Sequence, residues 1–480
     1  MLFNSLDFAV FLPIVFTIYW ILKDRLKSQN LIIVIASYVF YGWWDWRFLS
    51  LIIFSTAVDY FVGRQLYTAK KNTHRKLFLW VSICTNLGFL GFFKYYDFFL
   101  ENFINTFSIF GIGIEANSLN IILPVGISFY TFQTLSYTID VYRGKLAPTK
   151  DFIAFAAFVS FFPQLVAGPI ERATNLLPQF YKKRIFDYSQ AVDGMRQILW
   201  GLVKKVVIAD NCAEYANLIF NNSGDYSGST LALGAFFFAF QIYGDFSGYS
   251  DIAIGVSRLF GFDLMRNFAN PYFSRDIAEF WRRWHISLST WFRDYVYIPF
   301  GGSKGSLVNK IRNTFIVFMV SGFWHGADWT FIVWGALNAI YFLPLLLLKR
   351  NRINLEVVAS DKTLPSFREI VQIIFTFGLT TIAWIFFRAN DISHALSYLR
   401  GLFEHPDSYF LLSIYLSYAD VIIIILIFIC IEWIGRDSQF AIQKLLLKKN
   451  RVIRYTFYYI LIIAIFWIGG KEQDFIYFQF

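Results

Sequence analysis

The run Phe315-Ile-Val-Phe-Met-Val-Ser-Gly-Phe-Trp-His-Gly326 decides how this chain folds. It closes an apolar segment, 313–324, and a second apolar segment follows at 329–348. Of the five histidines, only His325 interrupts a stretch that is apolar enough to cross a bilayer. An ionisable side chain at membrane depth costs about 2.5–3.5 kcal/mol on insertion scales, so its default interpretation is functional.

The composition of the whole chain agrees with a membrane setting. Of 480 residues, 57% are hydrophobic, 21% aromatic and 16% charged, whereas soluble domains carry roughly 25% charged residues. The net charge of +10 comes from Lys and Arg in short loops between apolar runs, which indicates membrane orientation rather than a nucleic-acid partner. Cys84, Cys212 and Cys430 have neither metal nor disulfide spacing, so no metal site is expected.

Many apolar runs follow one another along the chain. A helix needs roughly 20 residues to cross the hydrocarbon, and several runs are shorter or interrupted by Pro or Gly. Such pieces are tolerated only when they are packed in protein or line a cavity. We therefore predict one transmembrane domain over 1–480, an all-α polytopic bundle with broken or re-entrant helices around a central funnel or tunnel. The runs are 8–22, 30–44, 48–63, 77–98, 121–141, 151–167, 195–209, 229–257, 313–324, 329–348, 369–387, 410–434 and 453–469.

Loop charge predicts the orientation of these segments. Loops rich in Lys and Arg, which stay in the cytoplasm, mostly alternate with the loops 101–120, 211–228 and 324–329, which have none. The alternation places both termini outside the cell membrane. The alternation fails once, because basic residues flank the run 151–167 on both sides. This run is therefore predicted to be a re-entrant hairpin. On this map His325 lies at the outer end of its helix and His285 near the cytoplasm, so the two histidines occupy opposite ends of a hollow.

Apolar residues recur at three- and four-residue steps through 276–298, which predicts one amphipathic helix at the inner membrane interface. Its basic residues suit an anionic, phosphate-bearing donor from the cytoplasm, although a basic interfacial helix can also serve only as an anchor. The candidate donor-binding residues are Arg282, Arg283, Arg293 and Lys304, the last in the turn Gly301-Gly-Ser-Lys-Gly305.

A buried imidazole stays neutral near pH 7 and can accept a proton from a hydroxyl group. Moving an acyl group from a thioester to an alcohol needs such a base, together with shelter from water and donors for the developing oxyanion. Trp324, Trp329 and Asn338 are candidate donors near His325. The chain has no nucleophile elbow, His-Glu-x-x-His pair or dinucleotide fingerprint.

Several motifs resemble those of the membrane-bound O-acyltransferase (MBOAT) family. The core of the resemblance is Phe280-Trp-Arg-Arg-Trp-His-Ile-Ser-Leu-Ser-Thr-Trp-Phe-Arg-Asp-Tyr-Val-Tyr-Ile-Pro299 together with Gly322-Phe-Trp-His-Gly326. Leu123-Pro-Val-Gly-Ile-Ser-Phe-Tyr130 and Tyr243-Gly-Asp-Phe-Ser-Gly-Tyr-Ser-Asp251 resemble its bacterial polysaccharide branch, that of alginate O-acetyltransferase. Each motif is weak alone, but their shared order covers nearly the whole chain.

The resemblance implies that His325 is catalytic and that His285 is the second family histidine. It also implies a cytoplasmic thioester donor, such as acetyl-coenzyme A, with no permanently bound cofactor. The acceptor is then an exported polysaccharide such as alginate, with a periplasmic acetyltransferase partner, and the setting is the bacterial inner membrane. D-alanyl transferases of cell-envelope polymers share the Trp-His pattern, so they remain an alternative.

The chain ends Phe475-Ile-Tyr-Phe-Gln-Phe480, which resembles a carboxyl-terminal aromatic motif of polysaccharide acylation systems. The resemblance makes Tyr477 a candidate acyl relay, and the alternative is an interfacial aromatic anchor. Asp245 and Asp251 flank Gly248 in an apolar run, which predicts buried carboxylates paired with Arg282 or Arg283 as structural support. A transporter or a non-enzymatic export subunit is the remaining alternative from another functional class.

Overall fold

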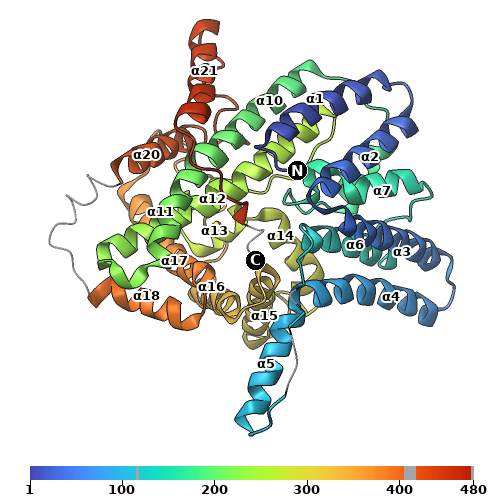
Figure 1. Ribbon diagram of the computed structural model, residues 1–480, viewed down its shortest axis with the longest axis horizontal. Helices are drawn as coiled ribbons and strands as arrows, with labels where there is room; N and C mark the ends of the chain where they lie inside the picture. The colour runs from blue at the N-terminus through green and yellow to red at the C-terminus, as the bar shows by residue number, and fades with distance from the viewer. Residues whose placement is uncertain (115–117, 120, 405–417, 477–480) are drawn as a thin grey trace. The chain divides into compact units, whose positions relative to one another are not determined.

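The computed structural model describes residues 1–114, 118–119, 121–404 and 418–476, and every regular element in these ranges is a helix (Figure 1). Four helical stretches within them are long and apolar enough to cross a membrane: Leu26–Thr68, Asn72–Ile109, Trp329–Leu347 and Phe367–Arg388. A shorter apolar helix covers Leu6–Ile21. The all-helical membrane fold predicted from composition is confirmed.

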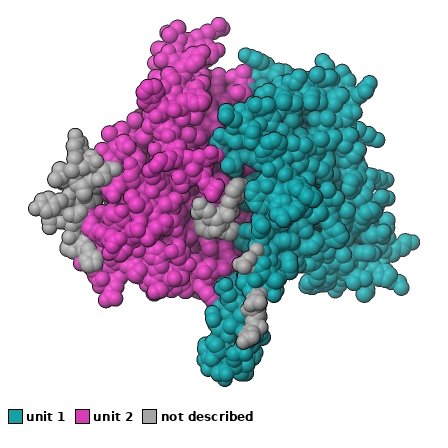
Figure 2. Space-filling model, viewed as in Figure 1, with its two compact units in different colours: residues 1–191, 256–265 teal, residues 192–255, 266–480 magenta. Residues whose placement is uncertain are grey.

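The chain divides into two compact units (Figure 2). Unit 1 comprises Met1–Ala191 and Val256–Met265, and unit 2 comprises Val192–Gly255 and Arg266–Phe480. The organisation of 1–480 as one domain around a central funnel stays a prediction. Both predicted histidines belong to unit 2, so that unit positions the candidate site.

Unit 1 joins its long helices through buried polar groups. On α3 the carboxylate of Asp59 accepts hydrogen bonds from Ser82 Oγ at 2.5 Å and Asn86 Nδ2 at 2.8 Å, both on α4. Inside a membrane the hydrophobic effect does not drive helices together, so polar side chains between apolar helices stabilise their association. The elements are α1 (Leu6–Ile21), α2 (Leu26–Asp45), η1 (Trp46–Phe48), α3 (Leu49–Thr68), α4 (Asn72–Leu90), η2 (Gly91–Tyr95), α5 (Tyr96–Ile109), α6 (Ile127–Tyr142), α7 (Phe152–Ser160), α8 (Phe162–Leu165), α9 (Ala173–Leu176) and η3 (Leu177–Tyr181).

The predicted hairpin at 151–167 consists of α7 and α8, which have nine and four residues. Neither is long enough to cross the hydrocarbon. The break falls at Phe161, the residue directly before α8, whose backbone leaves helical geometry. Pro163 follows within the first turn of α8. The short helices agree with a segment that does not span, while its side of entry stays a prediction.

Unit 2 contains the remaining helices. The π-helical turn η4 interrupts the path from α10 to α11, and α10 and α12 each have residues in both units. The elements are α10 (Tyr188–Leu202), η4 (Val203–Ala209), α11 (Asp210–Asn221), η5 (Ser223–Asp225), α12 (Gly228–Leu259), η6 (Pro271–Phe273), α13 (Ile277–Arg283), α14 (Ile286–Phe292), η7 (Arg293–Tyr297), α15 (Leu307–His325), α16 (Trp329–Leu347), α17 (Phe367–Arg388), α18 (Ile392–Glu404), α20 (Ala419–Ile434) and α21 (Arg451–Trp467).

The prediction of one amphipathic helix over 276–298 is wrong. The segment is broken into α13, α14 and η7, and the break is at His285, whose φ is 44°. Its apolar stripe is also not an interfacial face, because Phe280, Trp284 and Leu288 are 2%, 1% and 1% exposed. The periodicity marked a buried face correctly but could not reveal a break that contains neither Gly nor Pro.

Helices α15 and α16 form a hairpin with direct backbone contact. A Cβ atom on Gly322 would overlap the carbonyl oxygen of Phe331, and one on Gly335 would overlap that of Phe318. Small residues at such positions let two apolar helices approach closely. This contact fixes the end of α15, where His325 lies.

Candidate active site

His325 is the last residue of α15 and is only 3% exposed. The chain turns directly after it, and the Asp328 carboxylate accepts a hydrogen bond from Thr330 N at 2.7 Å to start α16. Aromatic rings from α16 and α17 enclose the imidazole: the Trp334 ring centroid lies 5.2 Å away and that of Phe387 lies 5.4 Å away. The apolar neighbours keep bulk water from the ring.

His285 sits in the break between α13 and α14, and it is fully buried. Its left-handed backbone conformation, φ 44° and ψ 53°, is uncommon for residues other than glycine and turns the side chain out of the helical path. The Phe246 ring packs edge-on against the imidazole at 4.6 Å. This connector lies outside the membrane-spanning helices, and burial holds the pKa of His285 well below the usual value for histidine. The imidazole is therefore neutral and can accept a proton.

The two imidazoles lie side by side, with ring centroids 6.2 Å apart. The predicted placement at opposite ends of a hollow is wrong, because the break at His285 brings its ring to the end of α15. The Trp324 ring lies beside both imidazoles, 4.9 Å from the His325 ring and 6.0 Å from the His285 ring. Histidines in one cluster can act on the same pair of reacting atoms, which separated histidines could not.

Asn267 holds the break at His285, and the sequence interpretation missed it. Its carbonyl oxygen accepts from Ile286 N at 2.9 Å, and its Oδ1 accepts from Ser287 Oγ at 2.9 Å. Its Nδ2 donates to Ser250 Oγ on α12 at 3.1 Å. The fully buried Asn267 thus ties α12 to Ile286 and Ser287, the two residues that directly follow the break. The only signal in the sequence is a polar residue between the apolar stretches around 264 and 268.

Asp245 and Asp251 are buried and paired, as predicted, but their partners are lysines of η4. Lys204 Nζ lies 3.0 Å from Asp251, and Lys205 Nζ lies 2.9 Å from Asp245. The predicted pairing with Arg282 or Arg283 is wrong. Adjacent lysines within the apolar run 195–209 were the available signal, since charges in such runs usually have buried partners.

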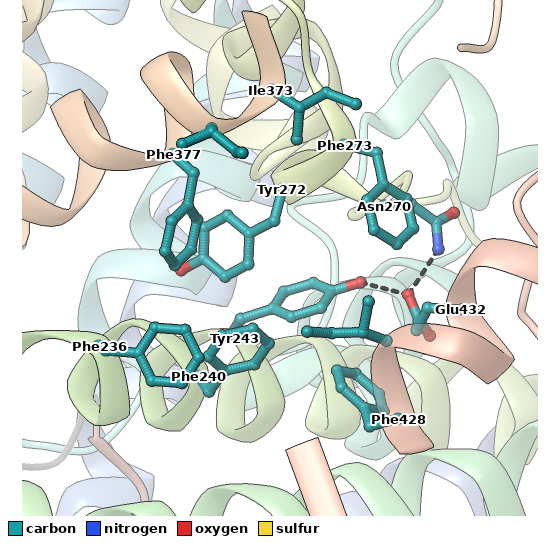
Figure 3. Close-up of a pocket in the computed structure, with 12 residues that line it drawn as sticks. Phe236, Phe240, Tyr243, Asn270, Tyr272, Phe273, Ile373, Phe377, Phe428 and Glu432 are labelled. Atoms are coloured by element: carbon teal, nitrogen blue, oxygen red, sulfur yellow. Dashed lines mark hydrogen bonds between the residues drawn. The ribbon is translucent and has the colours of Figure 1, made fainter. Parts of the chain in front are cut away.

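The lysine network also reaches Glu432 on α20, whose carboxylate lies 3.4 Å from Lys204 Nζ. Figure 3 shows Tyr243 and Asn270 converging on this carboxylate, with donor distances of 2.7 and 2.5 Å, at one end of a cavity of about 220 Å³. Rings such as Phe240 line the rest of the cavity. The polar groups of this cavity bond one another, and no histidine is among the residues that line it.

The four basic residues predicted to bind the donor fall into two groups. Arg282 donates to the carbonyl oxygens of Asn351 and Asn354 at 2.9 and 2.7 Å, so it holds the loop after α16. Arg283 bonds Glu279 on its own helix. Arg293 pairs with Asp294 at 2.8 Å and is largely exposed, and Lys304 is exposed in its glycine-rich turn. Only the second group presents charge at the surface.

A second cavity, of about 250 Å³, lies against α15. Thr314, Val317, Phe318 and Ser321 of α15 line one side, and Ser321 is one helical turn before His325. The other lining residues are Trp281, Ser289, Phe292, Tyr297, Ser303, Phe342, Leu346, Asn351 and Arg352. The Trp281 ring lies 5.7 Å from Trp334, which contacts His325. The cavity combines hydroxyl groups with apolar walls.

The remaining predicted residues differ in their surroundings. Asn338 is buried, donates to Trp334 O at 2.8 Å and accepts from Trp281 Nε1 at 3.3 Å. Trp329 is 51% exposed at the start of α16. Tyr477 lies outside the described residues. Among the predicted donors, Trp324 is therefore the one whose ring lies beside both histidines.

Comparison with known proteins identifies the family. The family model described as MBOAT, membrane-bound O-acyltransferase family, matches residues 147–387, which include both histidines. The chain is 39% identical over 409 residues to the probable alginate O-acetylase AlgI of Azotobacter vinelandii, covering 85% of this chain and 79% of that protein. It is 40% identical over 406 residues to the AlgI protein of Pseudomonas aeruginosa, covering 84% and 75%.

A relative with a different printed activity is nearly as similar. The chain is 37% identical over 432 residues to the peptidoglycan O-acetyltransferase of Helicobacter pylori, covering 84% of this chain and 80% of that protein. All three relatives match across most of their length. The chain is thus a multi-pass membrane protein of the membrane-bound O-acyltransferase family, and it is an acyltransferase.

Proposed function

We propose that this protein moves an acetyl group from acetyl-coenzyme A toward the hydroxyl groups of an exported polysaccharide such as alginate. The alginate O-acetylases at 39–40% identity support the substrate class. The observation that carries the proposal is the pair of buried imidazoles with ring centroids 6.2 Å apart inside the segment that matches the family. Peptidoglycan is the second candidate acceptor, favoured by the Helicobacter pylori relative.

His325 acts as the general base in this proposal. Its ring nitrogen takes the proton from the acceptor hydroxyl, and the oxygen attacks the carbonyl carbon of the thioester. When the tetrahedral intermediate collapses, the carbon–sulfur bond breaks and the thiolate recovers the proton from the imidazolium. His285, neutral because of burial, and Trp324 lie beside this ring and are the candidates for contacting the developing oxyanion.

The donor occupies the cavity along α15. Its hydroxyl groups, such as those of Ser303 and Ser321, and the amide of Asn351 suit the amide-rich arm that carries the thioester of coenzyme A. Ser321 lies one helical turn before His325. Arg352 at the cavity is exposed and can meet phosphate groups, while Arg282 holds the loop that carries it. Arg293 and Lys304 add positive charge at the surface.

The donor site is tested by Arg352→Gln, with Arg350→Gln as its control. Both arginines are exposed in the same loop, but only Arg352 lines the cavity. Loss of a charge-assisted contact worth about 1.5–3 kcal/mol raises KM for acetyl-coenzyme A by roughly 10-fold or more, and kcat changes little. Initial rates in purified membranes measure both constants. Equal KM values for the two variants contradict this placement.

The reaction is tested with His325→Ala in membranes supplied with labelled acetyl-coenzyme A and, separately, alginate or peptidoglycan. Loss of a general base lowers transfer by about 10²–10⁴-fold, while His74→Ala, at an exposed residue of unit 1, leaves the rate unchanged. Transfer that persists in His325→Ala, at equal protein level, overturns the assignment. Transfer from a D-alanyl carrier protein in place of acetyl-coenzyme A identifies the alternative activity.

The cellular setting completes the proposal. The protein lies in the bacterial inner membrane with both termini outside, as the loop charges indicate. The donor then arrives from the cytoplasm, and an acetyltransferase partner in the periplasm completes transfer to the polymer. Tyr477, near the outer end of the chain, is the proposed relay residue for that step.

A further inference from the structure

The carboxyl-terminal tail, defined here as residues 469–476, returns from an exposed helix end into the interior of unit 2. Trp467 at the end of α21 is 87% exposed, whereas Phe475 and Ile476 are 2% and 1% exposed. Chain termini are usually poorly ordered unless specific contacts tie them down. The burial of the tail therefore requires anchors.

The first anchor is the π-helical turn η4. Within it the Asp210 N–H donates to Lys205 O, five residues earlier, and the Val206 carbonyl oxygen accepts from Gly470 N at 3.0 Å. A Cβ atom at position 470 would lie 2.6 Å from Asn211 N, so only glycine can pass this close. Turns of this kind are rare in helices and are frequent at functional sites.

The second anchor is the ion pair of Lys205 and Asp245. Lys205 Nζ donates to the carbonyl oxygen of Gln473 at 2.9 Å, and Asp245 Oδ2 accepts from Ile476 N at 2.6 Å. The two side chains also contact each other at 2.9 Å. One buried pair thus bonds the tail backbone at two points, three residues apart, and we name it the tail clamp.

The clamped tail packs against the aromatic side chains of α12 that contact His285. The Phe475 ring lies 4.9 Å from Tyr249 and 6.3 Å from Phe246, both on α12. Phe246 in turn packs edge-on against the His285 ring at 4.6 Å. Only one aromatic layer therefore separates the tail from a histidine of the site.

We propose that Lys205 and Asp245 are positioning residues that seat the carboxyl-terminal tail behind Phe246 and thereby hold His285 in register with His325. The proposal rests on the acetyl-transfer function above. Without the clamp, the tail leaves its groove and the Phe246–His285 contact loses its support. Small displacements of a catalytic group can lower rates by about 100-fold.

The seating is tested in the full-length protein in membranes. Ile476→Cys, in a background without Cys84, Cys212 and Cys430, reports tail exposure through its rate of maleimide labelling. Asp245→Ala or Lys205→Met raises this rate at least 10-fold. Asp251→Ala is the matched control, because Asp251, on α12 like Asp245, also pairs with a buried lysine of η4 but does not bond the tail. Equal rates in all variants overturn the clamp.

The kinetic consequence is tested with Lys205→Met and with a chain that ends at Lys471, which keeps the clamp residues and lacks both the segment they hold, 472–476, and the proposed relay residue Tyr477. Both lower kcat about 10- to 100-fold and leave KM for acetyl-coenzyme A unchanged, because residues 281–352 form the donor cavity. Lys471→Ala, at a side chain 81% exposed, keeps full activity. Tyr477→Phe removes only the proposed relay hydroxyl and keeps the tail clamp, so it separates the loss of the relay from the loss of tail seating.

Four outcomes decide the matter. A normal kcat in Lys205→Met overturns the positioning role, and so does a raised KM with a normal kcat. A loss in Tyr477→Phe together with normal activity in Lys205→Met assigns the tail effect to Tyr477 alone and also overturns it. An inactive wild-type chain contradicts the proposed function instead, and the labelling experiment then still decides whether the clamp seats the tail.

Discussion

His285 has a backbone conformation that costs about 1–3 kcal/mol in a residue with a side chain. The hydrogen bonds of Asn267 to Ile286 and Ser287 hold it there. The strain has a visible consequence, because the same break brings the imidazole to 6.2 Å from His325. Asn267 thus helps to set the geometry of the histidine pair through the residues that follow His285.

Asn267→Leu keeps the size of this side chain and removes its hydrogen bonds. Buried polar partners left without a bond cost about 1–3 kcal/mol, and a displaced His285 lowers kcat by about 10- to 100-fold. Thermal unfolding and initial rates of purified protein measure the two effects. Asn105→Leu, at an exposed residue of unit 1, is the control. A normal kcat in Asn267→Leu shows that His285 needs no such support.

Among the individual residues of the candidate site, the sequence singled out some and missed others. His325 was recognisable because a histidine in an apolar run is expensive, and Asp245 because a carboxylate in such a run needs a partner. Its actual partner, Lys205, lies 40 positions earlier in the chain, and no local pattern joins the two. Glu432 and Asn267 escaped notice for the same reason, since their partners come from distant segments.

The helices show which sequence patterns predict the structure correctly and which do not. The apolar runs predicted most of the long helices within a few residues. Backbone N–H and C=O groups inside a membrane must bond one another, and a helix lets a single segment satisfy all of them. The segment 276–298 followed the pattern but is broken, because backbone bonds from Ala269 to Arg283 and from Ile286 to Asn267 replace helical ones. The spacing of apolar residues within one segment cannot reveal hydrogen bonds that its backbone makes to another segment.

The α15–α16 hairpin gives a prediction at this scale. Gly335→Ala places a Cβ against the backbone of Phe318, and the resulting overpacking costs about 1–3 kcal/mol. The hairpin then opens and His325, at its end, moves, so both the unfolding temperature and the transfer rate fall. Gly378→Ala on α17, where no atom lies within 4 Å of the added Cβ, leaves both unchanged. Equal unfolding temperatures for the two variants contradict the contact.

The proposed orientation of the whole molecule rests on its loop charges, and cysteine labelling measures it directly. In a background without native cysteines, Ser108→Cys lies at the end of α5, in the stretch 101–120 that has no Lys or Arg, and Thr73→Cys lies in the first turn of α4, next to basic residues. Both positions are exposed. A membrane-impermeant maleimide added to intact cells labels Ser108→Cys and spares Thr73→Cys until the membrane is opened. The reverse pattern contradicts the proposed orientation and the cytoplasmic route of the donor.

The sequence by itself determined the membrane setting and the helical class, and it singled out His325 as a candidate residue, because each depends on local composition and on the cost of charge in hydrocarbon. Only the tertiary structure decided that His285 lies beside His325, that lysines of η4 pair with Asp245 and Asp251, and that Lys205 and Asp245 bond the backbone of the carboxyl-terminal tail. These arrangements depend on hydrogen bonds and ion pairs between residues far apart in the chain. The energy of such contacts exists only once the helices have packed.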